Sequence, residues 1–266
     1  MDRKLGIIAE CIGGANTADV LKRVKDVGFS SVFTGKIARK EVEEVKSECD
    51  KLGLEVEFIH APFSGINEMW LEGDGYKRVY GGMIESIDSA KACGIPMIIT
   101  HVSSGWKPPR VGDVGLGRYD ALVDYAVKNG VKVAFENLRK VGNFACLMDR
   151  YENVAEVGFC YDVGHEHCYT VTVDVMDLYG DRTFCTHVHD NPGRDRRVFD
   201  ADPDLHLLPF DGTVDYQRVV DKLDEYEYSG SIMLEVFNHR QYSAWDTDRF
   251  IKEAYERAQK INALSK

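Results

Sequence analysis

Several features are scarce in this sequence, and each shortage argues against a class of protein. No apolar run approaches the roughly 20 residues that a helix needs to cross a bilayer. The first residues, MDRKLGIIAECIGG, have too short an apolar run and no clear cleavage site for a signal peptide. Basic residues number 33 against 44 acidic ones, a net charge of −11. Nucleic acids and anionic membranes are bound through clustered lysine and arginine, so neither is an expected partner.

The cysteines form no disulfide pattern. The seven are scattered at positions 11, 49, 93, 146, 160, 168 and 185. An odd, irregular set of this kind is typical of free thiols in a reducing compartment. Together with the missing secretion signal, it indicates a cytoplasmic protein.

Linkers, low-complexity tracts and short repeats are also missing from the 266 residues. The chain instead alternates short apolar runs of strand type with amphipathic helical segments about eight times. The strand-like runs begin at residues 5, 30, 54, 95, 131, 158, 183 and 231. Several helical segments end in glycine, a common helix terminator, as at Gly28, Gly53, Gly94 and Gly130.

Eight strand-then-helix units predict the α/β class. Short, apolar, non-alternating strands are typical of a parallel sheet that helices cover. Eight of them in this length favour a single (β/α)8 TIM barrel over residues 1–266, with the active site at the carboxyl ends of the strands. A doubly wound open sheet is the main alternative, and it is disfavoured because no GxGxxG follows the first strand.

Six of the expected strands end in an ionisable residue, namely His60, His101, Glu136, Asp162, His187 and Glu235. The residue two positions before each is small, apolar or cysteine, so the period of two directs all six polar groups into the barrel. One such residue alone is more often structural than a ligand. Six in matching positions would be costly without compensation. A divalent cation is the simplest compensation, because it neutralises carboxylates and binds imidazole.

Residues near the strand ends could extend a metal site. His165 follows Asp162 with the spacing D-x-x-H, which lets both side chains meet at one cation from a strand-to-loop turn. Asp204 and His206 could project together from the loop after the seventh strand. They could equally be a solvated charge and a structural histidine.

Other residues are candidates for contact with a substrate. His189 is expected to support the ligands or touch substrate rather than bind metal. Trp70 and Trp106 could wall a sugar pocket or simply cap the barrel. Arg194 could bind an anionic substrate, although a surface arginine needs no such role.

The motifs AFENL, GFCYDVGH, HVHDN, DLHLLPFDG and LEV lie between residues 134 and 236, and they are the most specific part of a resemblance that runs across essentially the whole chain. They resemble the xylose isomerase-like TIM-barrel superfamily, which holds sugar and sugar-phosphate isomerases and epimerases together with the endonuclease IV type of AP endonuclease (family 2). The resemblance to the ketose 3-epimerases of this superfamily implies one Mn²⁺-like ion, held by Glu136, Asp162, His187 and Glu235. They also imply that the two glutamates transfer protons and that His165 contacts substrate.

The endonuclease IV group implies a different metal count. The resemblance there suggests three zinc ions held by nine residues, His60, His101, Glu136, Asp162, His165, His187, Asp204, His206 and Glu235. One ion is the expectation here, with two or three as the alternative, and Mn²⁺, Zn²⁺, Co²⁺ and Mg²⁺ are all candidates. A homodimer or tetramer is expected from the family alone.

Three functions remain for comparison with the structure. The favoured one is a metal-dependent isomerase or epimerase of a small sugar or sugar phosphate, in which Glu136 and Glu235 transfer a proton through an enediolate. The alternative is a multinuclear zinc phosphoesterase acting on a small phosphodiester or abasic DNA. The nine-residue set favours it, and the charge of −11 counts against DNA. A non-catalytic sugar-binding barrel is least favoured, because the ligand set is intact.

Overall fold

The computed structural model describes residues 2–170, 172–195, 197–198 and 202–266. Its centre is a sheet of eight parallel strands: β1 (Leu5–Ile8), β2 (Ser31–Thr34), β3 (Glu55–His60), β4 (Met97–Thr100), β5 (Lys132–Glu136), β6 (Val157–Asp162), β7 (Thr183–His187) and β8 (Ile232–Leu234). The strands pair in the order β7-β6-β5-β4-β3-β2-β1-β8, and a parallel bridge between Val188 and Leu234 links the two ends. The fold is therefore the (β/α)8 barrel that the sequence predicts.

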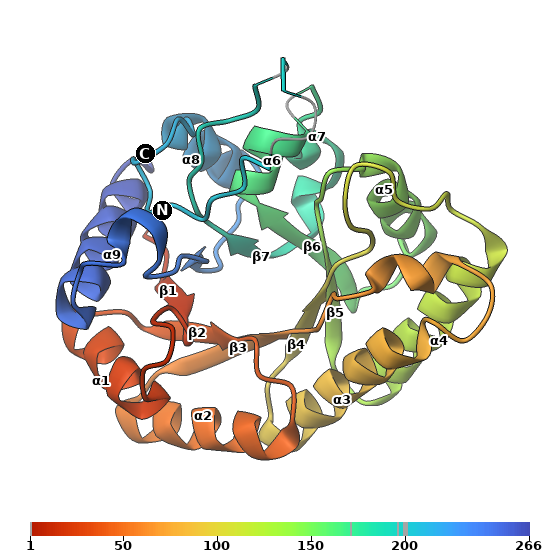
Figure 1. The fold of residues 1–266 in the computed structure, drawn as a ribbon, viewed down its shortest axis with the longest axis horizontal. Helices are drawn as coiled ribbons and strands as arrows, with labels where there is room; N and C mark the ends of the chain where they lie inside the picture. Colours follow the sequence, from red (N-terminus) through yellow and green to blue (C-terminus); the bar gives the residue numbers. More distant parts are fainter. Residues whose placement is uncertain (1, 171, 196, 199–201) are drawn as a thin grey trace.

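Helices form an outer ring around the strands (Figure 1). They are α1 (Thr17–Val27), α2 (Arg39–Leu52), α3 (Lys77–Cys93), α4 (Asp113–Lys128), α5 (Val141–Arg150), α6 (Val163–Tyr169), α7 (Val175–Tyr179), α8 (Tyr216–Glu225) and α9 (Thr247–Asn262). Short 3-10 turns add η1 (Ile66–Trp70), η2 (Gly180–Arg182) and η3 (Arg240–Tyr242). Among the described residues, no helix is both long and apolar enough to cross a membrane.

The helix ends follow from local sequence. Asn16 caps α1 by accepting a hydrogen bond from the backbone amide of Asp19 at 3.2 Å. Gly53 and Gly94 end α2 and α3 in the left-handed conformation, each with φ of 65°. A side chain with a Cβ is strained at that φ, which is why glycine marks these boundaries.

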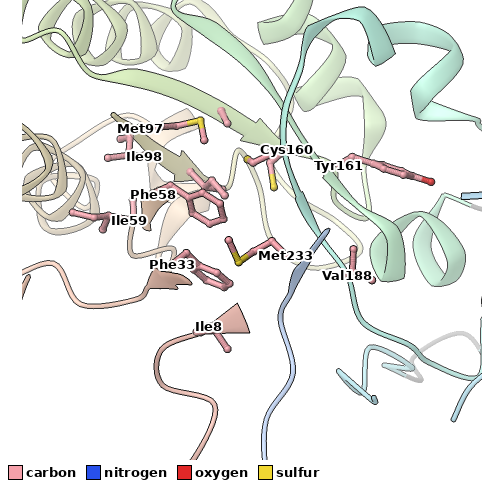
Figure 2. Packing of buried hydrophobic residues seen from close by; sticks show 14 of the residues in the cluster. Ile8, Phe33, Phe58, Ile59, Met97, Ile98, Cys160, Tyr161, Val188 and Met233 are labelled. Atoms are coloured by element: carbon pink, nitrogen blue, oxygen red, sulfur yellow. The ribbon is translucent and has the colours of Figure 1, made fainter. Parts of the chain in front are cut away.

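Large side chains fill the barrel interior just below the carboxyl ends of the strands (Figure 2). The rings of Phe33 and Phe58 stack at 4.8 Å between centroids, and Met233 lies beside them. A Cβ on Gly6 would lie 2.5 Å from the terminal carbon of Met233, so β1 needs glycine there. The ring of His187 lies 4.9 Å from that of Phe33, so the polar strand ends rest directly on an apolar layer.

This layer gives a test of the fold. Replacing Phe58 by alanine removes a fully buried ring and leaves a cavity beneath His187. We expect Phe58→Ala to lower the free energy of unfolding by about 3–5 kcal/mol, measured by urea denaturation. Leu178→Ala on α7 is the control, because Leu178 is 52% exposed, and we expect it to change stability by less than about 0.5 kcal/mol. Equal effects of the two changes would contradict this packing.

Candidate metal centre

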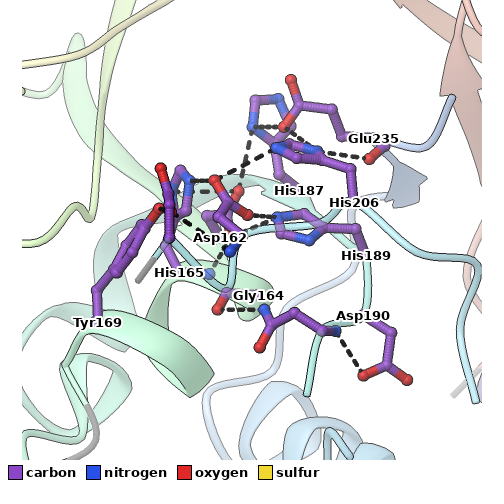
Figure 3. A network of polar contacts seen from close by, with 12 residues as sticks. Asp162, Gly164, His165, Tyr169, His187, His189, Asp190, His206 and Glu235 are labelled. Atoms are coloured by element: carbon purple, nitrogen blue, oxygen red, sulfur yellow. Dashed lines mark hydrogen bonds and ion pairs between the residues drawn. The ribbon is translucent and has the colours of Figure 1, made fainter. Parts of the chain in front are cut away.

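Ten side chains of metal-ligand type meet at the carboxyl ends of the strands, and Figure 3 shows part of this network. They include six of the chain's eight histidines. The ten are His60, His101, Glu136, Asp162, His165, His187, His189, Asp204, His206 and Glu235. Among the described residues they form four groups, three of which share members, and within each group the potential ligand atoms all lie within 4.8 Å of one another. All nine residues of the endonuclease IV-like set are therefore brought together.

The central group is the four-residue set implied by the epimerase resemblance, Glu136, Asp162, His187 and Glu235, and all four are buried. Nδ1 of His187 lies 3.4 Å from Oε2 of Glu235 and 3.5 Å from Oε1 of Glu136. The first three residues end β5, β6 and β7, and Glu235 directly follows β8. Closure of the barrel is what brings these four chain segments together.

A second group lies beside the first and shares Glu136 with it. Nε2 of His60 is 3.3 Å, and Nε2 of His101 is 3.1 Å, from Oε2 of Glu136. The other oxygen, Oε1, faces His165 and His187 at 3.1 Å and 3.5 Å. The two oxygens of Glu136 therefore face two different sets of imidazoles, an arrangement that suits a carboxylate bridging two cations.

A third group surrounds Asp204. Its Oδ2 lies 3.1 Å from Nε2 of His165 and 3.5 Å from Nε2 of His206. His189 joins this group, because its ring stacks on that of His206 at 4.0 Å and its Nε2 lies 3.2 Å from Oδ1 of Asp162. His189 was expected to support the ligands or touch substrate rather than bind metal. Its geometry also suits ligation of a cation.

Backbone carbonyls orient three of the histidines. Nδ1 of His60 lies 2.8 Å from the carbonyl oxygen of Ala61. Nδ1 of His165 lies 3.0 Å from the carbonyl oxygen of Asn137, and Nδ1 of His206 lies 2.9 Å from that of Glu235. A carbonyl only accepts, so each Nδ1 carries the proton. In the neutral imidazole, Nε2 then offers its lone pair, which is the arrangement of a metal-binding histidine.

Several buried polar atoms at this centre have no hydrogen-bond partner within the described part of the chain. They are both carboxylate oxygens of Glu136, Oδ2 of Asp162, Oδ1 of Asp204, and both ring nitrogens of His187 and His189. Their close approaches to one another do not have hydrogen-bond geometry, and burial without a partner is costly. Ligand atoms about 2.0–2.2 Å from a shared cation lie roughly 3–3.5 Å apart, as many pairs do here. The donor set therefore fits divalent cations.

Electrostatics supports the same interpretation. Burial by itself would raise the pKa of Glu136, but the nearby imidazoles of His101 and His187 outweigh it and hold that pKa well below its usual range. Burial disfavours a charged His187, yet the carboxylates of Glu235 and Glu136 raise its pKa to about 10. The carboxylates thus remain ionised and attract positive charge, either a proton on imidazole or a bound cation.

Local structure places the D-x-x-H pair. The strand-to-loop turn expected at His165 is instead the first turn of α6, since Asp162 caps this helix by accepting a hydrogen bond from the His165 amide at 2.6 Å. Oδ2 of Asp162 stays available to the centre. The backbone of Asp162 is held by Asn137, whose side chain bonds to its N–H and C=O at 2.7 Å and 2.8 Å.

Asp190 holds the loop that supplies Asp204 and His206. Its carboxylate accepts hydrogen bonds from the backbone amides of Phe210 and Val214, at 2.9 Å and 3.1 Å. Its own backbone pairs with Leu207 in an antiparallel bridge. Asp190 thus fixes the return of this loop to the barrel mouth.

A cavity of about 310 Å³ opens onto the centre. Sequence reasoning missed six of its described lining residues, and the two that bear most on ligand binding are Phe63 and Arg139. Each comes three positions after a strand-end ligand, His60 or Glu136, and this spacing is the signal that could have identified them. The ring of Phe63 stacks on His101 at 4.2 Å and is 48% exposed, so it forms an apolar wall.

The structure does not bring Trp70 to this cavity. Its ring is buried between η1 and α4, its Nε1 donates a hydrogen bond to the carbonyl of Val102 at 2.7 Å, and a Cβ on Gly115 would lie 2.1 Å from the ring. Of the two alternatives, Trp70 therefore takes the packing role. A sequence pattern does not reveal this, because the covering glycine lies on another helix.

Trp106 and Arg194 lie against each other, and neither lines the cavity at the metal centre. The guanidinium carbon of Arg194 is 4.2 Å from the centre of the Trp106 ring, and Trp106 meets Tyr169 edge-on at 5.4 Å. Arg194 lines a neighbouring groove of about 650 Å³ between α6 and α8, rather than the cavity at the metal centre. The position of Arg194 does not favour a direct contact with a substrate in that cavity.

Fold and site together define a (β/α)8 barrel with candidate metal-binding groups at the carboxyl ends of its strands. The chain belongs to the family described as xylose isomerase-like TIM barrel, which matches residues 21–261. The resemblance inferred from the motifs is therefore confirmed.

Three similar proteins illustrate the relationship. An uncharacterized protein of Sinorhizobium fredii, y4fM, is 26% identical over 240 residues, covering 75% of this chain and 74% of its own length. A xylose isomerase domain protein from Planctomyces limnophilus has the same fold, with a TM-score of 0.76, 16% identity and 98% of each chain covered. D-psicose 3-epimerase with D-tagatose, from Clostridium cellulolyticum H10, has a TM-score of 0.73 and 14% identity, covering 99% of this chain and 100% of that one.

The packing of the centre can be tested at Gly164. A Cβ at this position would lie 2.0 Å from Cε1 of the buried His189. We expect Gly164→Ala to displace His189 and to lower the free energy of unfolding by about 1–3 kcal/mol in urea denaturation. The matched control is Gly142→Ala on α5, where a Cβ meets nothing within 4 Å, and we expect it to be neutral or slightly stabilising. If both variants are equally stable, His189 does not pack as described.

Proposed function

We propose that the protein is a divalent-metal-dependent isomerase or epimerase of a small sugar. The observation that carries this proposal is the central group, in which Glu136 and Glu235 come from different strands and present oxygens within 4.8 Å of each other and of His187 and Asp162. Beside a cation site, one ionised carboxylate can accept a proton from the substrate, and a glutamate that carries a proton can return it.

Other observations support a sugar as the substrate. The cavity of about 310 Å³ is at the small end of the range for ligand pockets, about 300–1,000 Å³, which suits a monosaccharide. The fold is shared with D-psicose 3-epimerase, whose structure was determined with D-tagatose. The net charge of −11 argues against a nucleic acid.

The residues of the central group would share the chemistry as follows. Glu136, Asp162, His187 and Glu235 would hold the cation, which polarises the substrate carbonyl when bound. One glutamate removes the proton from the carbon next to the carbonyl, which leaves an enediolate, and a proton returned to either carbon or face completes the reaction. Phe63 covers one side of the cavity and limits the access of water.

A variant at Glu136 tests the proton transfer. We expect Glu136→Gln to slow the exchange of substrate protons into D₂O by about a hundredfold or more, because glutamine cannot accept the proton. The assay is NMR of a ketose panel with the metal-loaded protein. Glu57→Gln is the control, since Glu57 lies in β3 and bonds to Ser231, away from the cavity lining, and exchange should change by less than about threefold. Unchanged exchange in Glu136→Gln would remove Glu136 from the proposed role.

A second candidate function, a multinuclear phosphoesterase, is favoured by a specific observation. The groups around Glu136 with His60 and His101, and around Asp204, offer ligands that a one-ion epimerase does not require. A small phosphodiester would fit the cavity, whereas a nucleic acid meets an acidic protein.

The metal count separates the two functions. If the protein is an isomerase or epimerase, one ion per chain should suffice. The double variant His60→Gln/His101→Gln should then keep the rate of proton exchange within about tenfold of the parent. The second expects two or three ions per chain, and the same variant should lose an ion and the hydrolysis of bis(p-nitrophenyl) phosphate. Elemental analysis of the purified protein and both assays on both proteins give the answer. One ion per chain, together with no hydrolysis of this phosphodiester by the parent protein, would contradict the second function.

A further inference from the structure

Arg139 is the only lysine or arginine among the described residues that line the cavity at the metal centre. It follows Glu136, the last residue of β5, by three positions, so the barrel scaffold places it. Its side chain is 16% exposed. A cation in this position faces the same small space as the candidate ligands.

The guanidinium of Arg139 packs against aromatic rings at the cavity wall. Its central carbon lies 3.9 Å from the centre of the Tyr169 ring and 5.6 Å from that of Trp106. A planar guanidinium can present two N–H groups to two oxygens of one anion. The aromatic contacts restrict the Arg139 side chain before any ligand arrives.

One carboxylate already occupies part of this fork. Nη2 of Arg139 donates a hydrogen bond to Oδ2 of Asp202 at 2.6 Å, and among the described residues this is its single hydrogen bond. A guanidinium has five N–H donors, so most of them have no partner among the residues that the structure describes. Asp202 is an exchangeable neighbour, because its side chain is 58% exposed and exposed ion pairs contribute little to stability.

We propose that Arg139 recognises an anionic group of the substrate, a phosphate or a carboxylate, and that Asp202 occupies that place in the free protein. The inference rests on the proposed function and narrows its substrate class to an acidic or phosphorylated sugar. The cavity is lined by both Arg139 and candidate metal ligands, so one monosaccharide can contact Arg139 and the metal site at once. Tyr169, which also donates to Asp202 at 2.5 Å, can hold the displaced carboxylate.

Binding measurements on the metal-loaded protein test this inference. The probes are D-fructose, D-tagatose, their 6-phosphates and their 6-carboxylate (keto-uronate) counterparts, titrated by calorimetry. We expect at least one anionic probe to bind about tenfold or more tighter than its neutral parent, and the tighter class identifies phosphate or carboxylate as the group. Arg139→Met keeps the aliphatic stem on Tyr169 and should remove this preference, while Arg139→Lys should restore part of it.

A variant of the partner distinguishes recognition from a structural role. Asp202→Asn breaks the same ion pair from the other side, and it should strengthen binding of the anionic probe by about threefold or more, because the competing carboxylate is gone. If Arg139 only held the loop that carries Asp204, both variants would weaken all probes alike, and that result would overturn the proposal. No preference for any anionic probe in the parent protein would also overturn it.

The outcome is separable from that of the proposed function. Anion preference that depends on Arg139 but is accompanied by no proton exchange would leave the anion site standing and remove the isomerase proposal. Proton exchange into ketoses, accompanied by no preference for any anionic probe, would do the reverse.

Discussion

Four carboxylates, those of Glu136, Asp162, Asp204 and Glu235, gather at one end of this barrel, and their mutual repulsion is the constraint on which the site depends. Three of them are fully or almost fully buried, so solvent cannot screen the charge. Positive charge must therefore be supplied locally. Six histidines surround the carboxylates, and each can either carry a proton or direct a lone pair at a cation.

The scaffold around the centre serves this constraint. Phe33 and Phe58 form a dry floor under His187, which strengthens every electrostatic interaction above it. Backbone carbonyls and the cap of α6 fix the orientation of individual ligands, so little reorganisation is required when a cation binds. Among the described residues, buried atoms of Glu136 and His187 have no hydrogen-bond partner, which is costly to stability and would be compensated by a bound cation.

Much of the candidate site could be predicted because a strand has a period of two. Once eight parallel strands were inferred, His60, His101, Glu136, Asp162, His187 and Glu235 had to end on the inner face of one barrel mouth. Position relative to the loops was not predictable in this way. His189 was expected to support the ligands or touch substrate, and its stacking on His206 became visible only in the structure, because the loop held by Asp190 folds back over it.

The sequence by itself determined the fold class, the family and the six convergent strand ends, because hydrophobic periodicity and strand polarity are encoded locally. The tertiary structure alone decided that Glu136 faces two groups of imidazoles, that Trp70 packs against α4, and that Arg139 stacks on Tyr169 beside the cavity. These facts depend on contacts between segments far apart in the chain. Only closure of the barrel sets those distances, and no local pattern records them.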